Sequence, residues 1–281
     1  MEKWRGRPVN QPDGAERSEK PGDSRREYRR FAPASGPAPR PAADFVFGIQ
    51  SVLETLRSGK EIDKLLVQRE LGNLEVLEFA RMRGIPVQKV PTEKLDRITR
   101  KNHQGVIAFV AAVNYAKLEN IVADVFERGL TPLILLLDRV TDVRNFGAIA
   151  RTAECAGVQA IVVPVKGGAQ INADAMKTSS GALNFLPVCR EDTLTQTVRY
   201  LQESGIHVVG CTEKVGKTIY ELDFTIPTAL ILGSEEDGIS DELLRLADEL
   251  ASIPIQGRVG SLNVSVASGI ALYEVIRQRM V

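Results

Sequence analysis

The stretch Ser252–Val281, SIPIQGRVGSLNVSVASGIALYEVIRQRMV, decides how the rest of the chain is interpreted. We expect a short apolar strand over Ser252–Ile255, followed by a loop punctuated by Gly257 and Gly260. From Asn263 onward, apolar residues recur at helical spacing, which predicts a helix. A strand, a tight loop and a helix start form the place where α/β proteins bind ligands, because the loop frees backbone groups and the helix N-terminus carries positive partial charge. A strand–helix turn with a polar cap would explain the same residues.

The composition is that of a globular protein of one or two domains. The 281 residues include 36 basic and 36 acidic ones, and 43% are hydrophobic. A nucleic acid partner would therefore have to meet local basic patches. The three cysteines have no metal-ligand spacing and there are only two histidines, so we expect no metal site. Because no apolar run approaches the roughly 18 residues of a membrane span, and no secretory signal is visible, we expect no membrane partner and a cytoplasmic protein.

Residues 1–43 have the composition of a disordered basic tail. They hold seven of the fourteen prolines and ten Lys/Arg against six Asp/Glu, with almost no aliphatic residues. Such a segment buries too little apolar surface to offset its ordering entropy. Its arginines interleave with Tyr28 and Phe31, so the tail could contact RNA or could simply aid solubility.

Residues 44–113 show the pattern of a small α/β domain. Helices are expected around 52–56 and 74–80, and strands at 64–67, 85–90 and 106–111. Between the last two strands lies KLDRITRKNHQG, residues 94–105, with Arg97, Arg100, Lys101 and His103. A solvated helix end explains this segment, and so does an edge that contacts RNA phosphate and ribose oxygens.

Residues 114–130 have helical spacing and bridge to a larger domain at 131–281. There, strands and helices alternate, which predicts a mainly parallel sheet covered on both faces. Strands are expected at 133–137, 160–163, 185–188, 206–210, 229–232 and 252–255, and helices at 145–156, 173–180, 193–203 and 240–250.

Two further loops of this domain follow buried strands. In the first, DRVTDVRNFGAIARTAECAG (138–157), Asn145 suits a helix start and Gly147 allows close approach of another backbone. Arg151 lies six positions after Asn145, and we expect both side chains to point toward the same side. In the second, LILGSEEDGIS (230–240), Glu235 and two more acids lie between Gly233 and Gly238.

The acidic loop is unsuited to phosphate, because like charges repel, but suits hydroxyl groups, amines or a cationic ligand. Each loop alone has an ordinary explanation, namely a surface ion pair for the arginine and a solvated turn for the acids. No glycine signature of the dinucleotide or phosphate-loop type follows any expected strand, which disfavours a nucleotide-binding dehydrogenase.

Together, the three loops resemble the three motifs of the SpoU (TrmH-like) family of RNA ribose 2′-O-methyltransferases. The matching residues are, loop by loop, Asn145, Gly147 and Arg151, then Gly233, Glu235 and Gly238, then Ser261, Leu262, Asn263 and Ser265. Their order and spacing fit, and the likeness covers roughly residues 45–281, including the HQG at 103–105. Val143 stands where the family usually has proline, which removes no functional group.

The resemblance implies a trefoil-knotted methyltransferase domain with a small L30e-like RNA-binding domain, acting as a homodimer with its active site near the subunit interface. It implies S-adenosylmethionine as methyl donor, held near Gly233, Ile253 and Leu262. The implied substrate is a ribose 2′-hydroxyl in RNA, above all a guanosine of 23S ribosomal RNA.

The resemblance also implies the catalytic residues, which are Asn145, Arg151, Glu235, Ser261 and Asn263. An arginine holds its proton too tightly to be a good base, so we expect Arg151 to orient the hydroxyl, and the proton acceptor stays open. Arg97, Arg100, Lys101 and His103 would contact the RNA. The alternatives are an enzyme acting on transfer RNA and a catalytically silent factor that binds RNA during ribosome assembly.

Overall fold

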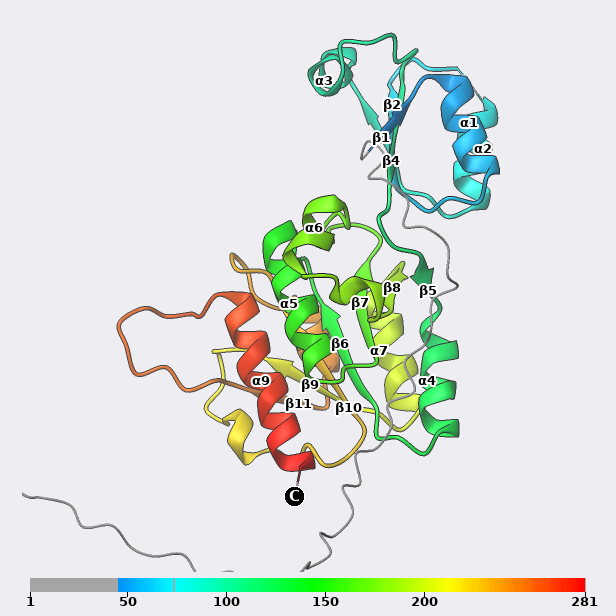
Figure 1. The fold of residues 1–281 in the computed structure, drawn as a ribbon. Coiled ribbons are helices and arrows are strands. Elements are labelled where there is room, and N and C mark those ends of the chain that lie inside the picture. Colours follow the sequence, from blue (N-terminus) through cyan, green and yellow to red (C-terminus); the bar gives the residue numbers. More distant parts are fainter. Residues whose placement is uncertain (1–44, 73, 281) are drawn as a thin grey trace, which may run out of the picture. The chain divides into compact units, whose positions relative to one another are not determined.

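The computed structural model describes residues 45–72 and 74–280 of the chain (Figure 1). The tail expected at residues 1–43 lies outside the described residues, so that prediction is not tested. Among the described residues, no helix combines the length and the apolar character needed to cross a membrane. The strands form two sheets, one in the first part of the chain and one in the remainder.

Residues 45–110, which lie within the small α/β domain expected from the sequence, contain the first sheet. Within the described residues this sheet has four strands in the order β1-β4-β2-β3, where β2 and β3 are parallel and the other pairs antiparallel. Its strands are β1 (Phe45–Phe47), β2 (Ile62–Gln68), β3 (Val87–Val90) and β4 (Val106–Val110). Its helices are α1 (Ile49–Arg57), α2 (Leu74–Met82) and α3 (Thr92–Ile98).

Different helices pack on the two faces of this sheet. Helices α1 and α2 lie on one face, where Val52, Leu56 and Ala80 pack on the sheet (Figure 1). The other face carries α3, whose Leu95 is fully buried against Leu66 and Ile107. Because α3 has only seven residues, it covers part of its face.

The larger sheet is parallel throughout, as predicted from the alternating pattern. Among the described residues it has the order β11-β9-β10-β6-β7-β8-β5. Its strands are β5 (Tyr115–Ala116), β6 (Leu133–Leu137), β7 (Ala160–Pro164), β8 (Val188–Glu191), β9 (His207–Cys211), β10 (Thr228–Leu232) and β11 (Glu249–Ala251). All five residues of β6, LILLL, are buried, as expected for a central strand covered on both faces.

Helices pack on both faces of this sheet (Figure 1). One face carries α5 (Val143–Cys155), α6 (Ala173–Thr178) and α9 (Val264–Arg279), and the other carries α4 (Leu118–Glu127), α7 (Leu194–Glu203) and α8 (Asp241–Leu246). Short 3-10 turns occur at η1 (Ala182–Asn184) and η2 (Ile219–Glu221). The close approach of another backbone predicted at Gly147 is confirmed, because a Cβ there would lie 3.1 Å from Ala175 O of α6, and 2.6 Å from Thr178 Cβ.

Several element boundaries differ from the prediction, and three of the differences lie at strands or helices of the larger sheet that border on the site or its neighbours. The strand expected at Ser252–Ile255 is absent; its place in the sheet is taken by β11, three residues earlier, which pairs with β9. Pro254 lacks the N–H that a paired strand donates, which explains the shift. The helix expected to reach 250 ends at Leu246, since Asp248 bonds to β9 instead, its N–H donating to Val208 O at 2.9 Å. The strand expected at 185–188 begins only at 188.

Candidate functional site

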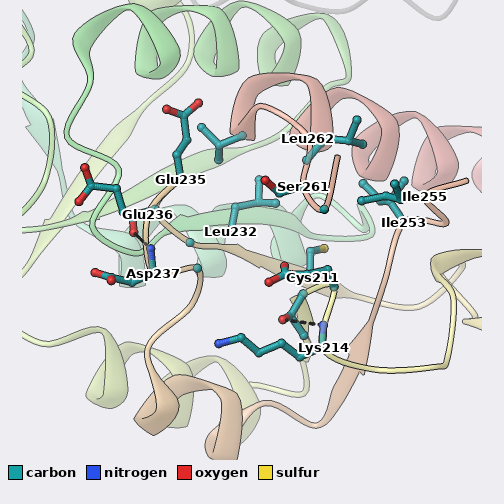
Figure 2. A pocket seen from close by; sticks show the side chains of 18 residues that line it. Cys211, Lys214, Leu232, Glu235, Glu236, Asp237, Ile253, Ile255, Ser261 and Leu262 are labelled. Atoms are coloured by element: carbon teal, nitrogen blue, oxygen red, sulfur yellow. Dashed lines mark hydrogen bonds between the residues drawn. The ribbon is translucent and has the colours of Figure 1, made fainter. Parts of the chain in front are cut away.

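A cavity of about 390 Å³ opens where β9, β10 and β11 reach their carboxyl ends (Figure 2). Such a position is the usual ligand site of parallel α/β sheets. The loops after β9 and β10 and the segment between β11 and α9 line it. The three residues expected to hold a cofactor, Gly233, Ile253 and Leu262, all lie in its wall, as does Ser261.

The three predicted loops meet beside this cavity through three polar side chains. Asn145 Nδ2 donates to Glu235 Oε1 at 3.0 Å, and Asn263 Nδ2 donates to Asn145 Oδ1 at 3.1 Å. The same Asn263 amide also donates to Glu235 Oε1. Residues separated by up to 118 positions in sequence therefore form one junction. The prediction that the loops converge is confirmed.

The way in which α5 and α9 are capped leaves the side-chain amides of Asn145 and Asn263 available for the junction. Asp142, and not Asn145, caps α5, because its Oδ1 accepts from the N–H groups of Arg144 and Asn145, both at 2.8 Å. The amide of Asn145 therefore reaches across to Glu235. Asn263 does both tasks, since its Oδ1 caps α9 by accepting from Ser265 N at 3.0 Å while its Nδ2 bonds the junction.

The acidic loop is fastened from beneath by the end of β6. Buried Asp138 accepts from Ser240 N through Oδ2 at 2.7 Å. Arg139 has a left-handed backbone, φ 57°, and donates from Nη1 to Asp237 Oδ2 and from Nη2 to Gly238 O, both at 3.1 Å. Arg139 was not among the predicted site residues, although its position two residues after the buried strand β6 is a signal for the ligand-binding edge of the sheet. The Glu235 loop thus has a fixed shape before any ligand binds.

The cavity walls differ in chemistry. Ile253, Ile255 and Leu262 form one side, whereas the acidic loop with Glu235 stands opposite (Figure 2). The end of β9 and the loop after it, which were not among the predicted site segments, contribute Cys211 and Lys214. Their position could have been inferred, since β9 and β10 are parallel neighbours and end at one edge. Burial raises the pKa of the Cys211 thiol to about 12, so it stays protonated at neutral pH and is no nucleophile.

Arg151 does not join the junction. It lies on the exposed surface of α5, it does not line the cavity, and it has no hydrogen bond or ion pair among the described residues. The expectation that it points with Asn145 fails for a geometric reason. Six helical positions turn through about 600°, which leaves the two side chains about 120° apart.

The basic segment of the small domain divides into exposed and buried residues. Arg97, Arg100 and Lys101 are exposed. His103 is only 8% exposed and has partners on both ring nitrogens, Asp96 Oδ1 at 3.0 Å and Gly105 N at 3.0 Å. It therefore holds the turn that presents the neighbouring cations. Within the described part of the chain, no group of three or more His, Cys, Asp or Glu residues could hold a metal ion.

Comparison with known proteins identifies both parts of the chain. The model of the SpoU rRNA methylase family matches residues 132–273, and that of the RNA 2′-O ribose methyltransferase substrate-binding domain matches residues 45–116. The 23S rRNA (guanosine-2′-O-)-methyltransferase RlmB of Pseudomonas aeruginosa is 39% identical, over 83% of this chain and 96% of that protein. The putative TrmH family tRNA/rRNA methyltransferase YacO of Bacillus subtilis is 37% identical over 84% of this chain and 96% of its own.

Solved structures agree with these matches. The SpoU methyltransferase AviRb from Streptomyces viridochromogenes, in complex with the cofactor AdoMet, aligns with a TM-score of 0.54 and 27% identity, covering 84% of this chain and 90% of that one. The fold, the pocket and these matches define an S-adenosylmethionine-dependent RNA 2′-O-ribose methyltransferase. The chain belongs to the SpoU rRNA methylase family.

The residues around the cavity fit this cofactor. A volume of about 390 Å³ lies in the range of small-molecule sites. The apolar wall of Ile253, Ile255 and Leu262 suits a flat base, and the carboxylates of the acidic loop suit a cation. When bound, the cofactor supplies a methyl group activated by the positive charge on sulfur.

Proposed function

We propose that the chain methylates the 2′-hydroxyl of a guanosine in 23S ribosomal RNA. Relatives named for that activity are 36–39% identical over 83–84% of this chain, and the match spans at least 96% of their length. The observation that carries the proposal is the junction of Asn145, Glu235 and Asn263 at the rim of the cavity. A ribosomal RNA substrate would also make the protein cytoplasmic.

In this proposal the junction and its neighbours align the ribose. Glu235 has a second carboxylate oxygen that no described residue occupies, so it can accept a hydrogen bond from the substrate. Ser261 lines the same cavity and has no partner among the described residues, which leaves its hydroxyl available. Gly233, Ile253 and Leu262 hold the cofactor, and Asn145 and Asn263 fix the carboxylate. Alignment of this kind contributes much of the rate of a displacement reaction.

Arg151 enters the proposal through a second copy of the chain. Helix α9 packs on α5 and exposes Val266 and Tyr273, which are 51% and 54% exposed, near a loop in which Val259 is 74% exposed. Apolar side chains gathered in this way are typical of a protein interface. We propose a homodimer in which Arg151 of one subunit reaches the cavity of the other and orients the hydroxyl.

The domain division follows the same proposal. Residues 44–113 bind the RNA through Arg97, Arg100 and Lys101, presented by the turn that His103 fastens, and 131–281 carry the chemistry. The helix within 114–130 connects them. The matched ranges 45–116 and 132–273 support this division. The trefoil knot and the L30e-like character of the small domain stay predictions.

Replacing Arg151 tests the proposal. Arg151→Ala should abolish ribose methylation of 23S RNA while S-adenosylmethionine binding and the melting temperature remain unchanged, because the side chain is exposed and unpaired among the described residues. Mixing subunits sharpens the test. In a heterodimer of Arg151→Ala with Glu235→Gln, one of the two active sites has both residues intact, so the heterodimer should regain about half of the wild-type activity. Near-normal methylation by the Arg151→Ala homodimer would reject the assignment, and no recovery in the mixture would reject the shared site.

The alternatives predict other outcomes. Mass-spectrometric mapping of ribose methylation with and without the protein would reveal a transfer RNA substrate. A silent assembly factor would bind RNA without binding S-adenosylmethionine.

A further inference from the structure

The partly covered face of the small sheet carries three phenylalanines. Phe45 on β1 pairs with Phe109 on β4, and Phe109 pairs with Lys64 on β2, so three side chains stand in one row across neighbouring strands. Phe47 stands two positions after Phe45 on the same face. The ring centroids are 6.0 Å apart for Phe45 and Phe109 and 6.2 Å apart for Phe45 and Phe47. All three rings are half-buried.

Lysines lie over these rings without a neutralising partner. Lys64 Nζ is 5.1 Å from the centroid of Phe109, and Lys101 Nζ is 6.0 Å from that of Phe47. Neither lysine makes an ion pair with any described residue. Burial, with the like charge of Lys94, lowers the pKa of Lys64. The carboxylate next to Lys64 in sequence, Asp63, is bound to Tyr115 and lies near Arg190, so it is already engaged.

The opposite side of the same domain offers a comparison. Phe79 on α2 is also half-buried, and the guanidinium of Arg57 lies 5.7 Å from its ring centroid. There, however, Arg57 is paired with Glu75. A cation that stacks on a ring and is also neutralised by a carboxylate of the same domain has its interactions satisfied within the protein. The lysines on the sheet face have aromatic rings beneath them and positive charge left over.

We propose that this face, made of Phe45, Phe47, Phe109, Lys64, Lys94 and Lys101, binds unpaired nucleotides of the RNA substrate. The bases stack on the phenylalanine rings, and the ammonium groups move from the rings to the phosphates. Aromatic rings on a sheet are a platform that bases of any sequence can use, while free lysines match the backbone charge. The proposal rests on the proposed function only in taking RNA as the substrate. It implies that the target region must be single-stranded beside the modified ribose.

The experiment measures binding of a short single-stranded RNA containing 2-aminopurine to the full chain. Stacking should quench the fluorescence of 2-aminopurine in the wild-type complex, and a duplex of the same sequence should bind about tenfold more weakly. The variant Phe45→Leu with Phe109→Leu should lose the quenching and bind about tenfold more weakly. Phe79→Leu is the matched control and should behave as the wild type. Lys64→Gln should lower the slope of log affinity against log salt by about 0.7.

The outcomes separate this inference from the proposed function. No quenching in the wild type, or equal affinity of the Phe79 control and the double variant, would overturn the stacking face, even with methylation intact. Should the double variant fail to fold, the wild-type quenching and the Lys64→Gln slope still decide. Loss of methylation by the double variant with S-adenosylmethionine binding retained would support the inference. Failure of the wild type to methylate 23S RNA would contradict only the proposed function.

Discussion

Two loops border the cavity, and they are held in opposite ways. The acidic loop, residues 233–240, is closed by paired backbone bonds between Ser234 and Gly238, at 3.2 and 3.0 Å, and is tied to β6 through Asp138 and Arg139. In the facing loop, residues 256–262, every residue is exposed and none has a hydrogen bond to any described residue. Its two ends alone are fixed, at β11 and at the Asn263 cap.

The contrast indicates which part of the site is formed by folding of the chain alone. The acidic wall and the junction of Asn145, Glu235 and Asn263 need only the chain itself, so the polar groups are in place before substrate arrives. Groups placed in advance need no reorganisation during the reaction. Under the proposed function, contacts for the facing loop would come from the cofactor and from a second subunit. Ligand and partner would then close the pocket from the same side.

The largest effect should come from adding one methyl group to the fixed loop. A Cβ on Gly233 would lie 2.0 Å from Gly238 C and 2.1 Å from Ile239 N, which are backbone atoms that cannot rotate away. Gly233→Ala should therefore lower the free energy of unfolding by about 3 kcal/mol or more and abolish S-adenosylmethionine binding. Chemical denaturation and calorimetric titration measure the two effects.

The facing loop supplies the control. A Cβ on Gly260 meets no atom within 4 Å, so Gly260→Ala should leave the unfolding free energy unchanged. Equal destabilisation by both substitutions would contradict the distinction between the loops.

The sequence predicted that the loops meet, but it did not predict the hydrogen bonds that hold them in place. The apolar run of β6 and the alternation of strands and helices predict parallel strands, whose carboxyl ends share an edge, and that was sufficient to bring Asn145, Glu235 and Asn263 together. The fastening by Arg139 depends on a left-handed backbone and on partners about 100 residues away, which no local pattern contains. The early β11 likewise arises because pairing with β9 overrides the local preference for a longer helix.

The second-largest loss of stability should follow from removing the hydrogen bond that ties the acidic loop to the end of β6. Asp138 is only 5% exposed, and its loss leaves the partly buried N–H of Ser240 without an acceptor. Asp138→Ala should lower the unfolding free energy by about 2 kcal/mol and weaken S-adenosylmethionine binding, because the loop loses its link to β6. Urea denaturation with and without cofactor measures both.

Glu236 is the matched control for Asp138, as an acid in the same loop that is exposed and makes no described hydrogen bond. Glu236→Ala should shift stability by less than about 0.5 kcal/mol. A larger loss for Glu236 than for Asp138 would show that charge, and not the fastening, determines the stability of the wall.

The smallest effect on stability should come from the facing loop. Within one subunit Val259 is 74% exposed, so Val259→Ser should leave the melting temperature of the cofactor-free protein unchanged at concentrations where the subunits are separate. Trypsin should nevertheless cut sooner after exposed Arg258, one residue earlier, than after Arg139, whose guanidinium is bound to Asp237 and Gly238. Peptide mapping over a time course compares the two arginines within one molecule.

Binding of the cofactor should change the cleavage rate at Arg258 but not the rate at Arg139. Saturating S-adenosylmethionine should protect Arg258 by at least about tenfold, because Leu262 and Ser261 of the same loop line the cavity that it fills. The cleavage rate after Arg139 should change little, since the acidic loop that Arg139 contacts is ordered without cofactor. Protection of Arg139 without protection of Arg258 would reverse the assignment of the two loops. Protection of Arg258 by rising protein concentration alone would identify the second subunit, and not the cofactor, as the element that orders the loop.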